Sequence, residues 1–148
     1  MIVVTLIILL LILIILGIIE SYFHRLVLSE IPIRIHVNGS RGKSSVTRLI
    51  ASGLRAGGIK TLAKTTGTSP RVIDEEGKDR IIHRLRSASI GEQVRLLRKF
   101  SKKKPQAVVI ECMAVNPQYQ WVSEHKMIQS TISVITNVRP DHLDEMGI

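Results

Sequence analysis

The residues best suited to chemistry form one short segment rich in glycine and hydroxyl groups, Asn38-Gly39-Ser40-Arg41-Gly42-Lys43-Ser44-Ser45. Glycines let a backbone approach a phosphate closely and turn its N–H groups inward. Lys43 can then reach the terminal phosphates, and the Ser44 hydroxyl can join the coordination of Mg²⁺. The strict form of this motif has a glycine five places before Gly42, where this chain has Val37. The segment therefore predicts a shortened phosphate-binding loop for a nucleoside triphosphate.

A loop of this kind needs a strand before it and a helix after it. Apolar residues alternate before the loop, as in a strand, at Ile31, Ile33, Ile35 and Val37. Helical spacing follows the loop, at Val46, Leu49, Ile50, Gly53 and Leu54. The N-terminus of that helix adds the positive end of its dipole to the phosphate site. The alternative is a glycine-rich turn with a chance lysine and serine, which this context disfavours.

Other polar clusters follow later predicted strands, and the carboxyl ends of parallel strands meet at one edge of a sheet. Hydroxyls of the segment 64–68, Thr66 among them, could meet a metal or a phosphate, although an ordinary threonine-rich turn explains them equally well. Glu111 ends an apolar run, and because burying a carboxylate is costly we favour a Mg²⁺-binding role there. His142 lies between Asp141 and Asp144, which favours a metal or phosphate role over a structural one.

The pattern along the chain alternates strand and helix. Strands are expected at about 33–37, 60–64, 107–110 and 131–138, with a hairpin over 72–82. Helices are expected from the loop to about residue 56, from a capping box at Ser89-Ile90-Gly91-Glu92, and over about 118–127. This alternation predicts an α/β fold, a parallel sheet flanked by helices, preceded by one transmembrane helix. These strands would leave one sheet edge unpaired.

The N-terminal segment is an apolar run from Ile2 to Ile19, with no charged residue before Glu20. Eighteen helical residues span roughly 27 Å, close to the hydrocarbon thickness of a bilayer. A buried soluble helix or a cleaved signal peptide is a weaker explanation, since the run has no basic segment before it and no small-residue cleavage site. Arg25 and Arg34 follow the run, so the positive-inside rule places the remainder in the cytoplasm. We predict a single-pass anchor in the cell membrane (1–19) with its N-terminus outside, a juxtamembrane linker (20–30) and an ATP-binding domain (31–148).

Composition limits the partners. The formal net charge of the 148 residues is +9, which suits an anionic partner, whereas aromatic residues make up only 3%, which disfavours nucleic acid. The single cysteine, Cys112, fits a reducing compartment. Basic residues cluster in 80–86 and 95–104. These clusters are either a solvated helix face near an anionic leaflet or part of a substrate site.

Taken together, the motifs resemble those of the Mur ligase superfamily. The resemblance rests on the phosphate loop, on Glu111 after its apolar strand, and on the segments 136–138 and 141–144. The segments 38–44, 64–68, 90–93 and 111–117 are most similar to the ATP-dependent ligase subunit of bacterial poly-γ-glutamate (capsule) synthase, which also begins with a membrane anchor.

This resemblance implies an ATP- and Mg²⁺-dependent amide ligase. It would add glutamate to an acidic poly-γ-glutamate chain through an acyl phosphate, next to other subunits of a synthesis and export complex. By the family pattern, the loop residues 39–45 and Asn137 bind ATP, Lys43 contacts its phosphates, and Ser44, Glu111 and His142 hold metal.

Superfamily members continue beyond the position of Ile148, so the resemblance also implies that further parts of the site lie elsewhere. We expect the 148 residues alone to be poorly stable and catalytically incompetent. Two other functions stay open: a membrane-anchored nucleotide-binding subunit or inactive fragment, and another P-loop kinase or ATPase. The Asp-His-Leu-Asp segment 141–144 argues against the last, because a generic phosphate-loop protein does not need it.

Overall fold

The computed structural model describes residues 1–67, 69–82 and 90–140, and within them a six-stranded sheet has the order β4-β3-β2-β5-β1-β6. Its strands are β1 (Ile33–Asn38), β2 (Thr61–Thr65), β3 (Arg71–Ile73), β4 (Asp79–Ile81), β5 (Ala107–Glu111) and β6 (Ile132–Ile135). Strands β2, β5, β1 and β6 run parallel, and the β3–β4 hairpin joins β2 antiparallel. The predicted α/β class is therefore confirmed.

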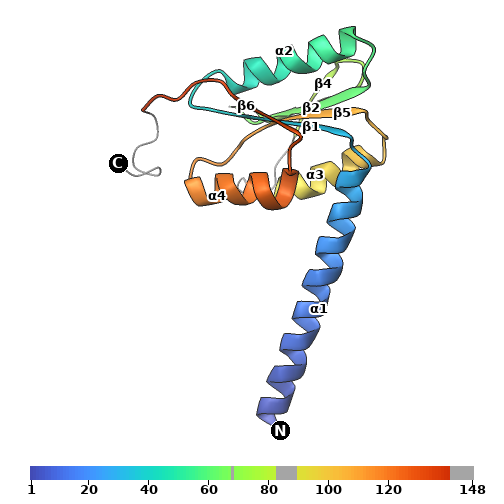
Figure 1. Cartoon of the computed structure of the whole chain (residues 1–148), viewed down its shortest axis with the longest axis vertical. Helices are drawn as coiled ribbons and strands as arrows, with labels where there is room; N and C mark the ends of the chain where they lie inside the picture. Colours follow the sequence, from blue (N-terminus) through green and yellow to red (C-terminus); the bar gives the residue numbers. More distant parts are fainter. Residues whose placement is uncertain (68, 83–89, 141–148) are drawn as a thin grey trace.

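Helices cover both faces of this sheet (Figure 1). The helical segments are α1 (Ile2–Ser29), α2 (Lys43–Ala56), α3 (Gly91–Ser101), α4 (Pro117–Val122) and the π-helical turn η1 (Ser123–Ile128), which continues α4. Helix α2 lies on one face, whereas α3 and α4 lie on the other, and α1 projects away from that second face. The helix predicted after the loop is present as α2. The helix predicted at about 118–127 is present as α4 and its continuation η1.

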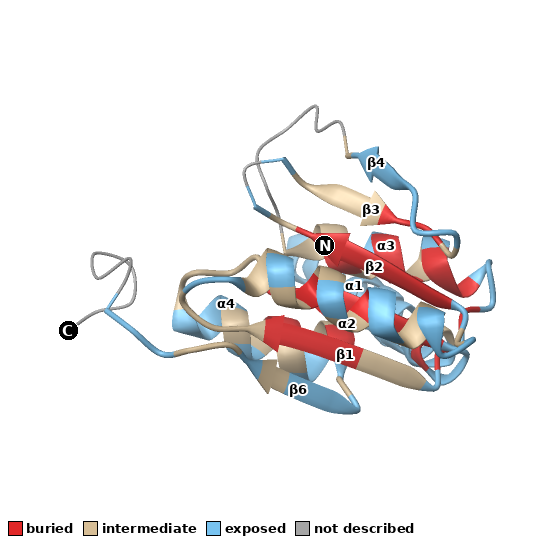
Figure 2. Ribbon diagram, turned by 90° about the horizontal axis from the view of Figure 1, so that it is seen from above, coloured by how far each residue is buried: buried red, intermediate tan, exposed pale blue. Residues whose placement is uncertain are grey.

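The core has two layers because the central strands are buried on both faces (Figure 2). In β5, Val109 packs with Ala51 of α2 on one side of the sheet. Its neighbours Val108 and Ile110 pack on the other side with Leu97 of α3. A strand covered on both faces needs a continuous apolar sequence, which is why 107–110 reads as an unbroken run.

Helix α1 is longer than the predicted anchor and continues to Ser29, so most of the predicted linker 20–30 is helical. Its 28 residues measure about 42 Å along the axis. By length and composition it can cross a membrane, and none of its most apolar stretch is buried against the rest of the protein.

The last turns of α1 are fixed to the domain by the side chains of Arg34 and His24. Arg34 Nη1 donates to Leu28 O at 2.9 Å, and Arg34 Nε donates to Gln129 O at 3.0 Å. His24 Nε2 lies 2.7 Å from Met127 O. Arg34 thus joins the carboxyl ends of two helices, where the helix dipole favours a cation. Helix α1 therefore leaves the domain in a defined direction.

The end of one predicted strand differs from the structure, and one predicted capping box is only partly described. Strand β6 ends at Ile135 rather than near 138. Helix α3 begins at Gly91, and Ile90 occupies its N-cap position without a side-chain capping bond. Ser89 of the predicted capping box lies outside the described residues. Glu92 also forms an ion pair with the buried Lys64, since a buried ammonium needs a carboxylate partner.

Candidate functional site

The predicted phosphate loop connects β1 to α2, and its two glycines adopt conformations that other residues avoid. Gly39 has a φ of +127° and Gly42 a φ of +79°. A Cβ on Gly39 would collide with Thr136 Oγ1 and lie 2.9 Å from Asn137 O. The loop backbone therefore turns tightly against the segment that follows β6, and only glycine fits at position 39.

That neighbouring segment holds the loop by hydrogen bonds. Ser40 N donates to Asn137 O at 3.0 Å, and Arg41 N donates to Asn137 Oδ1 at 3.2 Å. Asn137 Nδ2 and Thr136 Oγ1 both donate to Arg41 O, at 2.9 and 2.7 Å. Asn137, predicted to contact ATP, here supports the backbone of the loop that is predicted to do so.

Lys43 is the first residue of α2, and its side chain folds over the loop. Its Nζ donates to Gly39 O at 2.6 Å and to Ser40 O at 3.1 Å. The ammonium thus lies at the same turn as the glycine backbone, as a phosphate contact requires. Ser45, the third residue of α2, is exposed.

Glu111 joins three elements at the carboxyl ends of neighbouring strands. Glu111 is only 3% exposed, and its Oε2 accepts from Ser44 Oγ at 2.8 Å and from Thr66 N at 2.7 Å. Thr66 Oγ1 lies 3.5 Å from Cys112 O. A carboxylate and a hydroxyl, with further oxygens nearby, form the kind of donor set that Mg²⁺ prefers. The residues present fit the predicted metal.

His142, with Asp141 and Asp144, lies outside the described residues. Among the residues that the structure describes, His, Cys, Asp and Glu side chains form no group of three that could hold a metal ion. The site as described therefore consists of Ser44, Glu111 and the phosphate loop.

A buried lysine next to this site was not singled out by sequence reasoning. Lys64 at the end of β2 is fully buried, with its Nζ 3.0 Å from Glu92 Oε1 and 3.8 Å from Met113 Sδ. The sequence offers only a general indication of this pair, because a lysine inside a strand covered on both faces must have a charged partner. The pair ties α3 to the end of β2, two residues before Thr66.

A second pair, between the buried His36 and the partly exposed Glu124, was also missed. His36 Nδ1 lies 2.6 Å from Glu124 Oε2, and Ser130 donates its N–H and its hydroxyl to Glu124 Oε1. Burial lowers the pKa of His36, but the nearby Cys112 sulfur and the Glu124 carboxylate outweigh it and raise that pKa to about 9. The hydrogen bond from His36 lowers the pKa of Glu124 to about 2. The pair joins β1, which carries the loop, to η1.

Comparison with known proteins places these features in context. Residues 37–147 match the Mur ligase middle domain. The chain is 46% identical over 138 residues to the capsule biosynthesis protein CapB of Bacillus anthracis, which covers 90% of this chain and 29% of that protein. It is 41% identical over 144 residues to the PGA synthase CapB of Bacillus subtilis (strain 168), which covers 96% of this chain and 37% of that protein. The chain spans roughly a third of the length of these curated relatives.

Proposed function

This chain belongs to the Mur ligase family, and from that premise we propose that it carries the ATP-binding part of a ligase that extends poly-γ-glutamate. Similarity to two proteins named for capsule biosynthesis and PGA synthesis supports the choice of polymer. The acidic product also matches the net charge of +9 on this chain.

The observation that carries the proposal is the position of Glu111. Its buried carboxylate accepts from Ser44, in the first turn after the phosphate loop, and from the backbone of Thr66. A glycine loop alone binds phosphate. A buried carboxylate next to it adds a position for a cation between the phosphates and a second anion, which an acyl-phosphate ligase requires.

The proposed reaction has two steps. The γ-phosphoryl group of ATP passes to the terminal carboxylate of the polymer, giving an acyl phosphate and ADP. The amine of the next glutamate then attacks the acyl carbon, forming the amide and releasing phosphate. Mg²⁺ held by Ser44 and Glu111, with His142 as a further candidate ligand, would offset the repulsion between carboxylate and phosphate.

The loop residues bind and position the nucleotide in this scheme. The backbone of residues 39–42 and the Lys43 ammonium hold the phosphates and withdraw charge from the transferred group. Ser40, Arg41 and Asn137 keep the loop in shape through the bonds between them. The Ser45 hydroxyl, at the N-terminal turn of α2, is a further candidate phosphate donor.

Helix α1 is proposed to hold the domain at the cell membrane, with the N-terminus outside and the domain in the cytoplasm. Its apolar length supports a single span, and Arg25 and Arg34 on the domain side support this orientation. An enzyme placed in this way could pass its product to neighbouring subunits of a synthesis and export complex.

The proposal is tested with native membranes, in which this chain is present together with the further parts of the ligase that the family resemblance implies. ADP release is measured there with and without glutamate and a poly-γ-glutamate primer. Hydroxylamine in the same assay converts an acyl phosphate to a stable hydroxamate. The proposal predicts glutamate-dependent ADP release and a hydroxamate on the primer. ADP release that does not depend on glutamate would indicate another P-loop ATPase. ATP binding without turnover would indicate a nucleotide-binding subunit. Either result would contradict the proposal.

A further inference from the structure

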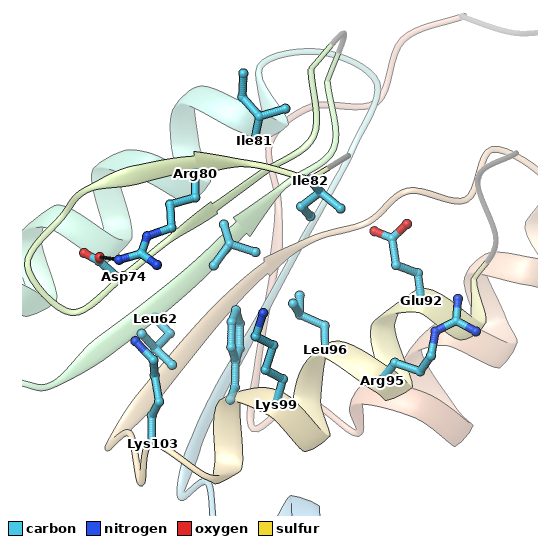
Figure 3. Close-up of a pocket in the computed structure, with 12 residues that line it drawn as sticks. Leu62, Asp74, Arg80, Ile81, Ile82, Glu92, Arg95, Leu96, Lys99 and Lys103 are labelled. Atoms are coloured by element: carbon cyan, nitrogen blue, oxygen red, sulfur yellow. Dashed lines mark ion pairs between the residues drawn. The ribbon is translucent and has the colours of Figure 1, made fainter. Parts of the chain in front are cut away.

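A cavity of about 440 Å³ lies between α3 and the β3–β4 hairpin (Figure 3). Its floor is apolar and includes Leu62, Val72, Ile82, Leu96 and Phe100. Its rim is charged, with the basic residues Arg80, Arg95, Lys99 and Lys103 and the acidic residues Asp74 and Glu92. An apolar floor under a mainly basic rim fits an elongated anion that also carries methylene groups.

The acidic residues of the rim are already neutralised within the fold. Asp74 Oδ2 lies 3.7 Å from Arg80 Nη2, and Glu92 pairs with the buried Lys64 at 3.0 Å. Lys103 is likewise paired, 2.9 Å from Glu75. The acidic groups therefore cancel little of the field of the remaining cations.

Arg95 and Lys99 are the cations left for a ligand. They lie one helical turn apart on α3 and both are exposed. Neither forms an ion pair with any residue in the ranges 1–67, 69–82 and 90–140. In Figure 3, Lys99 extends from α3 next to Leu96, on the side that faces the hairpin. Both cations thus border the apolar floor.

The cavity also starts next to the candidate site. Glu92 lies at one end of it, and its partner Lys64 precedes by two residues Thr66, which donates to Glu111. Lys103 lies at the other end, past the last turn of α3. A polymer chain that lay in the cavity would run from the site along α3 toward the amino ends of the parallel strands.

We infer that this cavity holds the glutamate polymer whose end reacts at the site, with carboxylates on Lys99 and Arg95 and methylenes on Leu96 and Phe100. The inference rests on the proposed function, since that function supplies the polymer. Each γ-linked unit has one carboxylate beside two methylenes, so the polymer alternates the two kinds of group that the cavity offers. A purely ionic polymer would use the rim and leave the floor unfilled.

The test measures binding directly, without catalysis. A short fluorescent chain of γ-linked glutamate is titrated with the membrane-extracted protein at physiological salt, and its anisotropy is followed. Reversing both charges (Lys99→Glu with Arg95→Glu) should weaken binding by at least about tenfold, a loss of 1.4 kcal/mol. The matched control is Lys102→Glu, an exposed lysine on the same helix end that does not line the cavity, and it should leave binding within about twofold.

Unchanged binding by the double variant would overturn the inference. So would an equal loss in the Lys102→Glu control, which would indicate unspecific attraction of polyanions. Competition by polyphosphate as strong as by unlabelled poly-γ-glutamate would do the same. The milder pair Lys99→Gln with Arg95→Gln, checked by thermal unfolding, separates loss of binding from loss of structure. Glutamate-dependent ADP release is measured in parallel. Binding at this cavity without ligation would contradict the proposed function but not the assignment of the cavity to a γ-glutamate chain.

Discussion

Ser44 Oγ lies 2.8 Å from Glu111 Oε2, and this hydrogen bond joins the first turn of α2 to the end of β5 across 67 residues of sequence. The same carboxylate oxygen accepts from Thr66 N at 2.7 Å. The segments that follow β1 and β2 therefore meet the last residue of β5. The meeting point lies at the carboxyl ends of these three strands, next to the loop that is proposed to bind ATP.

This arrangement predicts that Ser44→Ala weakens the response to Mg²⁺ more than it weakens the fold. The variant keeps the Thr66 N–H on Glu111 but loses the hydroxyl oxygen that would bind the cation. The Mg²⁺ concentration needed for half-maximal ATP binding should rise by about tenfold, as measured by calorimetric titration. Ser52→Ala, at an exposed position of the same helix, is the control and should behave like the original protein. Equal Mg²⁺ dependence of both variants would remove Ser44 from the metal site.

The conformation and surroundings of Gly39 predict that a side chain at this position would clash with its neighbours. Its φ of +127° and the contact of an added Cβ with Thr136 Oγ1 mean that Gly39→Ala must displace the loop from the segment that follows β6. We expect ATP affinity to fall at least about tenfold and the free energy of unfolding to fall by about 1–3 kcal/mol. In α2, Gly53→Ala meets nothing within 4 Å and should stabilise the protein by about 1 kcal/mol. A harmless Gly39→Ala in denaturant titrations and ATP binding would contradict this loop geometry.

The pair His36–Glu124 predicts how stability depends on pH. The folded pKa of His36 is raised to about 9, so its contribution is complete below its ordinary pKa of about 6.5 and is lost as the pH rises toward 9. The folded pKa of Glu124 is lowered to about 2, so its contribution is complete above about pH 4.5 and is lost as the pH falls. The stabilisation by this pair is therefore greatest between about pH 4.5 and 6.5.

Glu124→Gln should remove this dependence. At pH 6 we expect the free energy of unfolding to fall by about 2 kcal/mol, since a hydrogen bond to a charged partner is lost. The decline in stability between pH 6.5 and 9 should flatten in the same variant. Glu76→Gln is the control, because Glu76 is an exposed acid whose replacement should shift neither quantity. Urea unfolding at a series of pH values measures both, and an unchanged slope in Glu124→Gln would show that the pair does not stabilise the fold.

Much of the architecture could be predicted because local patterns and tertiary packing agree. The continuous apolar run at 107–110 is a central strand buried on both faces, and the alternation before Val37 is the strand that leads into the loop. The glycines at 39 and 42, predicted from the motif to form a tight loop, have positive φ angles. The position of Glu111 after its strand placed it next to Ser44 for the same topological reason.

What could not be predicted depends on contacts between distant residues. Nothing local indicates that Glu92 turns to Lys64, because the requirement comes from the burial of that lysine in the finished sheet. The sequence indicates Arg34 as a charge that flanks a membrane helix, yet its guanidinium also joins the carboxyl ends of α1 and η1. Asn137 was expected at the nucleotide, and its amide holds the loop backbone. Each of these roles depends on contacts between residues that are distant in the sequence and adjacent only in the folded protein.

The central claim is that the loop at residues 39–45 binds the phosphates of ATP, and calorimetric titration of Mg·ATP into the membrane-extracted protein tests it most directly. Lys43→Ala removes the ammonium that lies over the loop, with Nζ 2.6 Å from Gly39 O. Lys60→Ala, at an exposed position immediately before β2, serves as the charge-matched control. The account predicts one binding site, at least about tenfold weaker in Lys43→Ala and unchanged in Lys60→Ala. Binding of equal strength in Lys43→Ala would contradict it.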